Sequence, residues 1–515
     1  MESIVIDRRK TFFHNDFLND YYNTQKFEEL RTYAPKIEEV ATAIEGRKNF
    51  SQKKRSTLVS VLKEQYQEAQ IQLSGLLAEN INSLEKTNTY TITTGQQIHL
   101  GLGPLYVIYK AFDTIAIANE LSQKHPDCNF VPVFWMATED HDLEEIAEID
   151  VFGNKVKWTT DQVGPVGRMN TVGIAELFDQ ILEEYNFSED QKTFLAKCSK
   201  IYSTSQNLSI AFRRLLHQYT KDCGLVILDA DDAELKESFK EVMSDELQFK
   251  NFEALTKSTQ KLEELGYAKQ LNIRECNLFD MSTGDRKKIT KNIGAVAAAS
   301  REIDFYNLSP NAALRPFYQE WILPNLVYVG GPSEIKYWLQ LKGIFDNYSF
   351  PMPLLHLRKS NIILPERIKK TYSSEDLGRL FQQKSEITTH YSNELSKLNQ
   401  EFDNLFKSIS EGLTNYSELA AQSFKGFNLD GKVSKIKPKL VELEALVKAE
   451  LVNKGEQNSK LNKLLKLRDR YFNKESVQER NDHLLAHPAL LAVEAKMINS
   501  HFGFKYSQKI DLLFV

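Results

Sequence analysis

The feature that most constrains the fold is the stretch Thr94–Lys110, which joins a predicted strand to a predicted helix through a glycine-rich turn. The residues just before it, Tyr90–Thr94, are mostly β-branched or aromatic and predict a short buried strand. Apolar side chains recur at helical spacing after Pro104, and proline favours the first turn of a helix. A strand, a glycine-rich turn and a helix in this order are typical of a ligand-binding corner in an open α/β sheet.

The start of this predicted helix carries free backbone N–H groups, which favour an anion. Gly95, Gly101 and Gly103 do not follow the dinucleotide fingerprint, and the Gly-Lys-Ser/Thr sequence of a P-loop is missing from the turn. An anion or nucleotide site and an ordinary strand–helix turn therefore both remain open interpretations of the stretch.

Further strands extend the predicted core. Phe130–Ala137 is apolar on both faces, as expected in the middle of a parallel sheet covered by helices, and the β–α–β order predicts a Rossmann-like half. Buried strands are also predicted in Gly224–Asp229 and Met352–Arg358, while Leu326–Glu334 repeats the strand–glycine–proline–helix design. The predicted fold class is α/β with a parallel-sheet core, in which two helix starts face one cleft.

Other segments are predicted around this core. Residues 1–88 show helical periodicity and are expected to pack on the core as helices. Residues 155–168 predict a small β insertion. Ser309–Arg315 predicts a turn into a helix, with Ser309 as the N-cap and Pro310 in the first turn.

The sequence changes character near residue 371. Apolar residues then follow the alternating three- and four-residue spacing of a coiled-coil seam, at Leu395, Leu398, Phe402, Leu405 and Ile409. A break at Gly426–Gly431 separates them from a second Lys- and Leu-rich helical run. We expect an α-helical antiparallel coiled-coil hairpin that pairs with a second copy in a homodimer. The predicted parts are a helical segment (1–88), a core with inserted segments (89–370), the hairpin (371–473) and a return to the core (474–515).

Composition narrows the class of protein. A chain of 515 residues is too long for one hydrophobic core, and 65 basic against 70 acidic residues give a net charge of −5, so no nucleic-acid partner is expected. The first ten residues lack the apolar core of a signal peptide, and no apolar run reaches the ~20 residues of a membrane span. The 4 cysteines form no Cys-x-x-Cys pair. We expect a cytoplasmic protein with no membrane partner and no disulfide scaffold.

Several motifs go beyond a generic α/β pattern. Thr94–Gln97, Gly103–Tyr106 and Thr138–Asp142 resemble the bacillithiol biosynthesis cysteine-adding enzymes, a family of cysteine ligases. The resemblance continues along the chain in Tyr109–Lys110, Pro132–Trp135, Gly266–Tyr267, Gln270, Asn277–Phe279, Ser309–Asn311, Leu314–Pro316, Tyr328–Pro332, Glu334–Ile335, Met352–Pro353, Arg358–Ser360 and Gln478–Arg480. One departure is His99–Gly101, where many members have a glycine-led apolar sequence.

This resemblance implies a Rossmann-like core related in shape to the class I nucleotidyltransferases and class I aminoacyl-tRNA synthetases. It also implies inserted connecting segments and a coiled-coil domain that dimerises. The implied reaction is the last step of bacillithiol synthesis, which joins the cysteine carboxyl to the amine of glucosaminyl-malate. Because amide formation in water is uphill, ATP is expected to activate the carboxyl as an acyl-adenylate or acyl-phosphate. ATP or ADP binding is therefore expected, with Mg²⁺ as a further candidate and no structural metal.

The predicted catalytic residues are Glu139, Asp140, His141 and Asp142. Because adjacent residues cannot all converge on one point, about two of them are expected to act directly. An acidic residue could accept the cysteine ammonium, His141 could remove a proton from the attacking amine, and a carboxylate could bind the Mg²⁺ carried by ATP. The alternative is that Asp140 or Asp142 only caps the following helix.

The predicted substrate- or nucleotide-binding residues surround the two helix starts. They are Thr94, Gly95, Gln96, Gln97, Gly103, Pro104, Tyr106, Lys110, Ser309, Asn311, Arg315, Gly330, Gly331, Glu334 and Arg358. Lys110 adds positive charge if it points into the cleft, and is otherwise a solvated lysine. Gln96 and Gln97 could orient sugar hydroxyls or the malate carboxylate. Arg315 and Arg358 could clamp a carboxylate or phosphate, or form internal salt bridges.

Other functions also fit the sequence. The chain could be a non-catalytic nucleotide-binding scaffold with a degenerate ligase core, in which the coiled coil carries the function. It could also be a ligase that acts on a related small-thiol precursor. A metal-dependent hydrolase built on Glu139–Asp142 is weaker, because the block lacks the spaced second ligand set of such sites.

Overall fold

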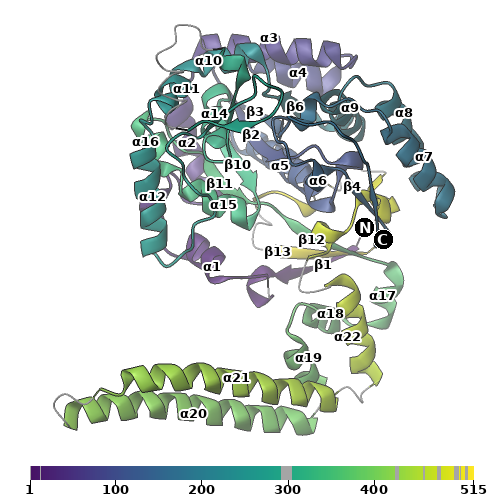
Figure 1. Ribbon diagram of the computed structural model, residues 1–515. Helices are drawn as coiled ribbons and strands as arrows, with labels where there is room; N and C mark the ends of the chain where they lie inside the picture. The colour runs from purple at the N-terminus through teal and green to yellow at the C-terminus, as the bar shows by residue number, and fades with distance from the viewer. Residues whose placement is uncertain are drawn as a thin grey trace. The chain divides into compact units, whose positions relative to one another are not determined.

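The computed structural model describes residues 2–11, 13–290, 304–391, 393–423, 428–455, 459–472, 477–491, 498, 500–504 and 509–514 (Figure 1). The chain forms two compact units. Unit 1 comprises Met1–Asp7, Asn15–Leu364 and Gln478–Val515, and unit 2 comprises Arg8–His14 and Pro365–Val477. None of the described helices is long and apolar enough to cross a membrane.

A five-stranded sheet forms the centre of unit 1. Its strands lie in the order β11-β10-β2-β3-β6, and every neighbouring pair is parallel. The strands are β2 (Thr89–Gln96), β3 (Asn129–Met136), β6 (Val226–Asp229), β10 (Asn325–Gly330) and β11 (Leu354–Leu357). The predicted parallel-sheet core is therefore confirmed.

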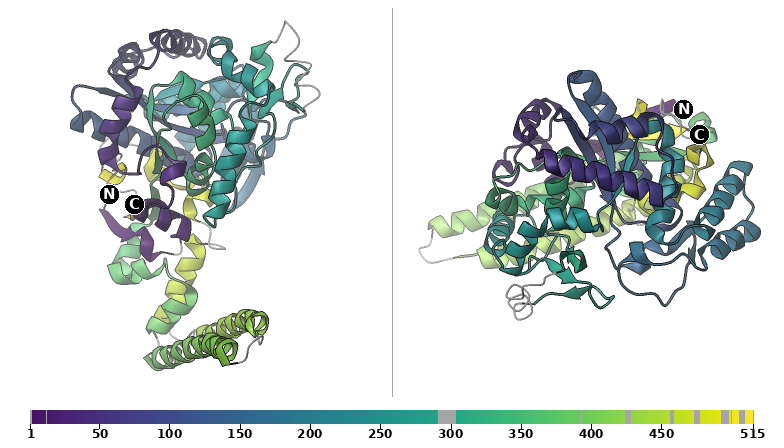
Figure 2. Two further views of the ribbon diagram at one scale, coloured as in Figure 1. Left: turned by 90° about the vertical axis from the view of Figure 1, so that its left-hand side faces the viewer. Right: turned by 90° about the horizontal axis from the view of Figure 1, so that it is seen from above.

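Helices cover both faces of this sheet, as Figure 2 shows. Alternate residues of β3 point to opposite faces: Val133 and Trp135 belong to a core cluster with α3 (Gln52–Glu68) and α14 (Arg315–Ile322). Phe134 and Met136 belong to another cluster, which includes α5 (Leu105–Lys124) and α9 (Leu208–Thr220). Burial on both faces explains why β3 reads as a continuous apolar run.

The remaining elements of unit 1 connect or flank the sheet. The helices are α1 (Asp16–Asn23), α2 (Val40–Arg47), α4 (Gly75–Ser83), α6 (Leu143–Ile146), α7 (Ile174–Glu184), α8 (Glu189–Ser203), α10 (Ala233–Ser238), α11 (Lys240–Leu247), α12 (Phe252–Glu264), α15 (Pro332–Leu339), α16 (Lys342–Asn347), α23 (Gln478–Asn481) and α24 (Pro488–Leu491). β4 (Glu148–Val151) and β5 (Asn154–Lys157) form an antiparallel hairpin. The β insertion predicted at residues 155–168 coincides with this hairpin only at Lys155–Lys157, and Val166–Arg168 forms a 3-10 turn. A second small sheet has the order β8-β7-β9, with strands Lys287–Lys288, Leu278–Asp280 and Leu308–Pro310.

The N-terminal residues differ from the sequence expectation. Residues 2–7 were expected to be helical but form strand β1 (Glu2–Asp7), antiparallel to β13 (Lys509–Phe514). β12 (Ser360–Leu364) pairs with the other edge of β13 in a parallel arrangement. The β-branched run Ile4–Ile6 favours a strand, and β13, which supplies its partner, lies about 500 residues away in the sequence. Local periodicity could not identify that partner.

The predicted helix start at Ser309 is also wrong. Ser309 and Pro310 belong to β9, and the helix α14 begins only at Arg315, with Leu314 as its N-cap. The turn between them is made by Asn311, whose side chain accepts hydrogen bonds from the N–H groups of Ala313 and Leu314 at 2.8 and 3.2 Å. An asparagine turn thus replaces the predicted serine cap.

Unit 2 is helical. Its helices are α17 (Glu366–Thr371), α18 (Ser374–Arg379), α19 (Lys384–Tyr391), α20 (Asn393–Ser423), α21 (Asp430–Gly455) and α22 (Ser459–Tyr471). The long helices α20 and α21 lie side by side (Figure 1), joined by contacts of Ser417 with Asp430 and of Lys448 with Asp403. Residues 426 and 427 of the predicted break lie outside the described residues.

Candidate active site

A cavity of about 390 Å³ opens at the carboxyl ends of the parallel strands of unit 1. Residues at or just after the ends of all five strands line it, among them Gln96, Glu139, Asp231, Gly331 and Arg358. Ligands of open α/β sheets bind at this edge, because the helix starts and loops converge there. This cavity is the candidate active site.

Most of the residues predicted from the sequence lie on the cavity wall. They come from the glycine-rich turn and α5, from the segment after β3, and from the elements around α14 and α15. The predicted residues on the wall are Gly95, Gln96, Gln97, Tyr106, Lys110, Glu139, Asp140, Asn311, Arg315, Gly331, Glu334 and Arg358. The sheet topology therefore brings together residues that are up to 263 positions apart in sequence, counting from Gly95 to Arg358.

Seven predicted residues do not line the cavity. Of the binding residues, these are Thr94, Gly103, Pro104, Ser309 and Gly330. The buried Thr94 hydroxyl donates to the carbonyl oxygen of Val329 at 2.8 Å and so ties β2 to β10. His141 and Asp142 of the predicted catalytic block are absent from the wall as well.

The anion site expected at the start of α5 does not lie on the cavity. The N–H of Leu105 donates to the carbonyl oxygen of Asp482 at 3.0 Å, and the Leu105 side chain is completely buried. Gly103 has φ +59° and lies against the His99 ring. The glycine-rich turn therefore places α5 against the C-terminal segment, and the parts that reach the cavity are Gly95–Gln97 on one side and Tyr106 and Lys110 on the other.

Lys110 is a buried member of the site and not a solvated lysine. Its Nζ lies 2.6 Å from Glu334 Oε2 and donates to Gly95 O and Gln96 Oε1, both at 2.8 Å. Glu334 also accepts hydrogen bonds from Tyr328 Oη and from the N–H of Gly331, each at 2.7 Å. Burial raises the pKa of Glu334, but the charge of Lys110 and the hydrogen bonds from Lys110, Gly331 and Tyr328 together outweigh burial and hold this pKa below the usual value. This ion pair joins α5 to the first turn of α15 at the cavity wall.

Four arginines bring positive charge to the cavity. Arg358 forms an internal salt bridge with Glu479 at 2.6 Å, the alternative that the sequence left open. Arg315 donates to Gln319 at 3.1 Å, and no carboxylate of the described residues lies within salt-bridge distance of it. Arg286 lies 3.6 Å from Asp140, and the fourth, Arg480, is exposed. Arg286 and Arg480 were not among the site residues predicted from the sequence.

The four residues of the acidic block diverge, as adjacent residues must. Glu139 is buried on the wall, with Oε1 2.8 Å from Lys236 Nζ, and Asp140 faces Arg286. The His141 side chain is 56% exposed, and its Nδ1 lies 3.4 Å from a guanidinium nitrogen of Arg286. Asp142 caps α6 by accepting a hydrogen bond from the N–H of Glu145 at 3.2 Å. The helix-cap alternative thus holds for Asp142.

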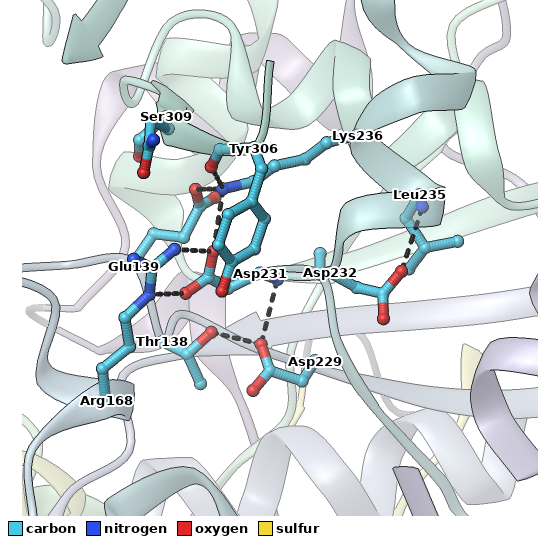
Figure 3. A network of polar contacts seen from close by, with 12 residues as sticks. Thr138, Glu139, Arg168, Asp229, Asp231, Asp232, Leu235, Lys236, Tyr306 and Ser309 are labelled. Atoms are coloured by element: carbon cyan, nitrogen blue, oxygen red, sulfur yellow. Dashed lines mark hydrogen bonds and ion pairs between the residues drawn. The ribbon is translucent and has the colours of Figure 1, made fainter. Parts of the chain in front are cut away.

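A polar network behind Glu139 was not predicted as part of the site (Figure 3). Asp231 binds Arg168 through two contacts of 2.6 and 2.8 Å, and Lys236 Nζ lies 2.8 Å from Asp231. Asp231 follows β6 at the same sheet edge as Glu139, so the strand-end argument could have found it. Lys236 comes from α10, where nothing in the local sequence marks it.

Among the residues that the structure describes, no three His, Cys, Asp or Glu side chains converge in a group that could hold a metal ion. Cys198 and Cys276 are buried, Cys128 and Cys223 are half-buried, and none of the four lines the cavity. Burial raises the pKa of Cys223 to about 11 and of Cys276 to about 12, so both thiols stay protonated near neutral pH.

Comparison with known proteins identifies the family. A family model described as "Bacillithiol biosynthesis BshC, N-terminal Rossmann-like domain" matches residues 1–359. The chain belongs to the BshC family. The Rossmann-like character predicted for the core is thereby confirmed, and the matched BshC domain contains all five parallel strands.

Relatives extend the BshC match beyond this domain. A protein of Flavobacterium psychrophilum is 34% identical over 505 residues, which cover 94% of each chain, and one of Flavobacterium johnsoniae is 34% identical over 504 residues with the same coverage. A protein of Cytophaga hutchinsonii is 37% identical over 367 residues, or 68% of each chain. All three carry the name "Putative cysteine ligase BshC".

Proposed function

We propose that this protein is a cysteine ligase of bacillithiol biosynthesis, which joins the carboxyl group of cysteine to the amine of glucosaminyl-malate. The observation that carries the proposal is a cavity with both cationic and acidic side chains in a chain of the BshC family. Both proposed substrates carry carboxylate and amino groups, so a site that binds them needs charges of both signs. The names of the BshC relatives support the reaction class.

We propose ATP as the reagent that activates the cysteine carboxyl. The new C–N bond forms when the amine attacks the activated carboxyl, and the departing carboxyl oxygen leaves on the phosphorus-containing product. Three arginines on the cavity wall suit the phosphates of ATP. Arg315 and Arg480 have no carboxylate partner among the described residues, and the carboxylate contact of Arg286 is a 3.6 Å contact with Asp140. Burial lowers the pKa of Arg286, yet a guanidinium remains charged near neutral pH.

Proton removal from the attacking amine is assigned to Asp140, which lines the cavity, together with His141, which lies off the wall with its Nδ1 3.5 Å from Asp140 Oδ1. His141 and Asp140 are adjacent, and Arg286 contacts both of them, at 3.4 and 3.6 Å. His141 is exposed, so it can exchange its proton with solvent after each turnover. Mg²⁺ carried by ATP would find the carboxylate of Asp140 at the cavity wall.

The test supplies purified protein with cysteine, glucosaminyl-malate and ATP and detects the cysteinyl product by mass spectrometry. Product formation with loss of ATP is the expected result. If no product forms and no ATP is lost with any of several divalent metals, the ligase proposal is wrong. Deletion of the gene followed by thiol labelling identifies the acceptor in the cell, because the precursor without cysteine should accumulate.

The Arg315 assignment has its own test. Arg315→Met should raise the KM for ATP or for the acceptor about 10- to 100-fold, because a charge-assisted hydrogen bond to an anion is worth about 1.5–3 kcal/mol. Arg367→Met removes an exposed arginine of unit 2 and serves as the control. Unchanged KM values in Arg315→Met would contradict the proposed role.

A further inference from the structure

One exposed carboxylate oxygen on the cavity wall accepts no hydrogen bond from any residue that the structure describes. Glu139 lines the cavity, and only 11% of its side chain is exposed. Its Oε1 is buried and forms an ion pair with Lys236 Nζ at 2.8 Å, without the geometry of a hydrogen bond. Its Oε2 is not among the buried atoms and accepts no hydrogen bond from the residues that the structure describes. Glu139 therefore presents one open acceptor atom to whatever enters the cavity.

The other carboxylates described on the wall have both oxygens in use. Asp231 contacts Arg168 with both oxygens and Lys236 with one. Glu334 Oε1 accepts a hydrogen bond from Tyr328 Oη. Glu334 Oε2 contacts Lys110 Nζ and accepts a hydrogen bond from the N–H of Gly331.

Asp140, the remaining wall carboxylate, is also occupied. Its Oδ1 accepts the N–H of His141 at 2.8 Å, and its Oδ2 lies 3.5 Å from the amide of Gln97. The free acceptor capacity of Glu139 is thus a distinguishing feature within the described wall.

A chain of alternating charges holds Glu139 in place (Figure 3). Lys236 is 1% exposed, and its Nζ contacts Glu139, Asp231 and the carbonyl oxygen of Tyr306 at 2.8, 2.8 and 2.9 Å. Arg168 closes the chain on the far side of Asp231. Two negative and two positive groups therefore alternate, and the open oxygen of Glu139 stands at the end of the chain.

We propose that Glu139 Oε2 receives a primary ammonium group of a substrate, and that Lys236 is the positioning residue that fixes this carboxylate. The inference rests on the proposed ligase function and deepens it. An ammonium group fits because it donates a charge-assisted hydrogen bond to a carboxylate, whereas the arginine-rich part of the wall repels it. Both proposed substrates carry an amino group, so the ammonium comes either from cysteine or from the acceptor.

Steady-state kinetics of Glu139→Gln distinguish these two sources. 3-Mercaptopropionate is cysteine without its amino group. If the ammonium is that of cysteine, Glu139→Gln should raise the KM for cysteine about 10- to 100-fold and leave that for 3-mercaptopropionate unchanged. If it is that of the acceptor, the KM for glucosaminyl-malate should rise instead. KM values for both substrates within twofold of wild type would overturn the proposal.

Two further variants control this experiment. Glu144→Gln removes a carboxylate of the same segment that is 89% exposed, and should behave as wild type. Glu139→Asp keeps the charge beside Lys236 but withdraws the oxygen from the cavity, so it covers the case in which Glu139→Gln fails to fold. It should raise the same KM as Glu139→Gln, and a wild-type KM in Glu139→Asp would overturn the proposal.

A binding measurement separates the subsite from the ligase function. Cysteamine carries the ammonium and thiol of cysteine without its carboxyl, so its binding needs no turnover. Calorimetry should show about tenfold weaker binding of cysteamine to Glu139→Gln than to wild type if the ammonium of cysteine occupies the site. If the ammonium of the acceptor occupies the site, glucosaminyl-malate should instead bind Glu139→Gln about tenfold more weakly than wild type. Equal binding of both probes by the two proteins overturns the ammonium site even if no product forms in any assay.

The positioning role of Lys236 predicts a pH effect. Lys236→Met leaves Glu139 and Asp231 as neighbouring carboxylates without the cation between them, which raises the pKa of the pair. The acid limb of kcat/KM for the ammonium-bearing substrate should move to higher pH by about one unit, and Lys236→Arg should restore it. A uniform loss of activity at every pH would show a merely structural role and overturn this part of the proposal.

Discussion

At the scale of single residues, two buried histidines make stability depend on pH. Burial lowers the pKa of both His99 and His483 to about 4, from a usual value of 6.5. Between these values the unfolded chain binds more protons than the folded one, so stability is full above pH 6.5 and is lost as pH falls toward 4. Each histidine should account for about 2 kcal/mol of loss at pH 5.

Thermal melts from pH 7.5 to 5 test this dependence. His99→Gln and His483→Gln should each flatten the fall of Tm with pH, although both lower Tm at pH 7.5 by disturbing a packed site. His125→Gln, which replaces the histidine at the C-terminal end of α5, is the comparison variant. An unchanged slope in the His99 and His483 variants would contradict the assignment.

The ion pair of Lys110 and Glu334 is a second residue-scale feature. Lys110→Met leaves the Glu334 carboxylate, which is 23% exposed at the cavity wall, without the buried cation that it contacts, so we expect a loss of about 2 kcal/mol in the free energy of unfolding and loss of activity. Lys124→Met, on the same helix and 46% exposed, should change stability by less than about 0.5 kcal/mol. Chemical denaturation measures both. Equal stability of the two variants would mean that Glu334 is neutral or solvated.

At the scale of elements, the sequence predicted the parallel strands better than their surroundings. The apolar run of β3 and the glycine–proline design of β10 and α15 are local signals, and both predictions are confirmed. Glu139 and Asp140 were predicted as site residues because they follow the carboxyl end of a parallel strand, and both lie on the cavity wall. Strand β1 and the role of Lys236 depend on partners far away in the sequence, so a local pattern could not supply them.

The turn before α5 yields a prediction for Gly103. A Cβ there would lie 2.4 Å from His99 Cβ, and φ is +59°. Gly103→Ala should therefore lower stability by more than the roughly 1–2 kcal/mol of backbone strain alone. Gly153→Ala isolates that strain, because Gly153 also has a positive φ, +89°, but no atom lies within 4 Å of its added Cβ. If the two variants lose equal stability, contact with His99 has no energetic consequence.

At the scale of the whole molecule, the long helices of unit 2 expose apolar side chains. Leu405, Leu419, Val441 and Leu446 are between 53% and 64% exposed. Isolated apolar side chains are common on surfaces, but several exposed ones on the same two helices are typical of an interface. We propose that a second copy of the chain covers this surface, which gives the coiled-coil homodimer expected from the sequence. The side chains of Leu395 and Leu398 lie outside the described residues.

Sedimentation of single variants tests the homodimer. Leu405→Glu places a charge in the proposed interface and should convert the dimer to monomers at micromolar concentration, because burying an unpaired carboxylate costs several kcal/mol. Lys407→Glu introduces the same side chain on the same helix at a position that is already 75% exposed and charged, and should leave the dimer intact.

The described cavity wall belongs to unit 1 of one chain, so monomeric Leu405→Glu should retain ligase activity. A monomeric wild-type protein would contradict the dimer but not the site, because none of the residues proposed to bind substrate comes from α20 or α21.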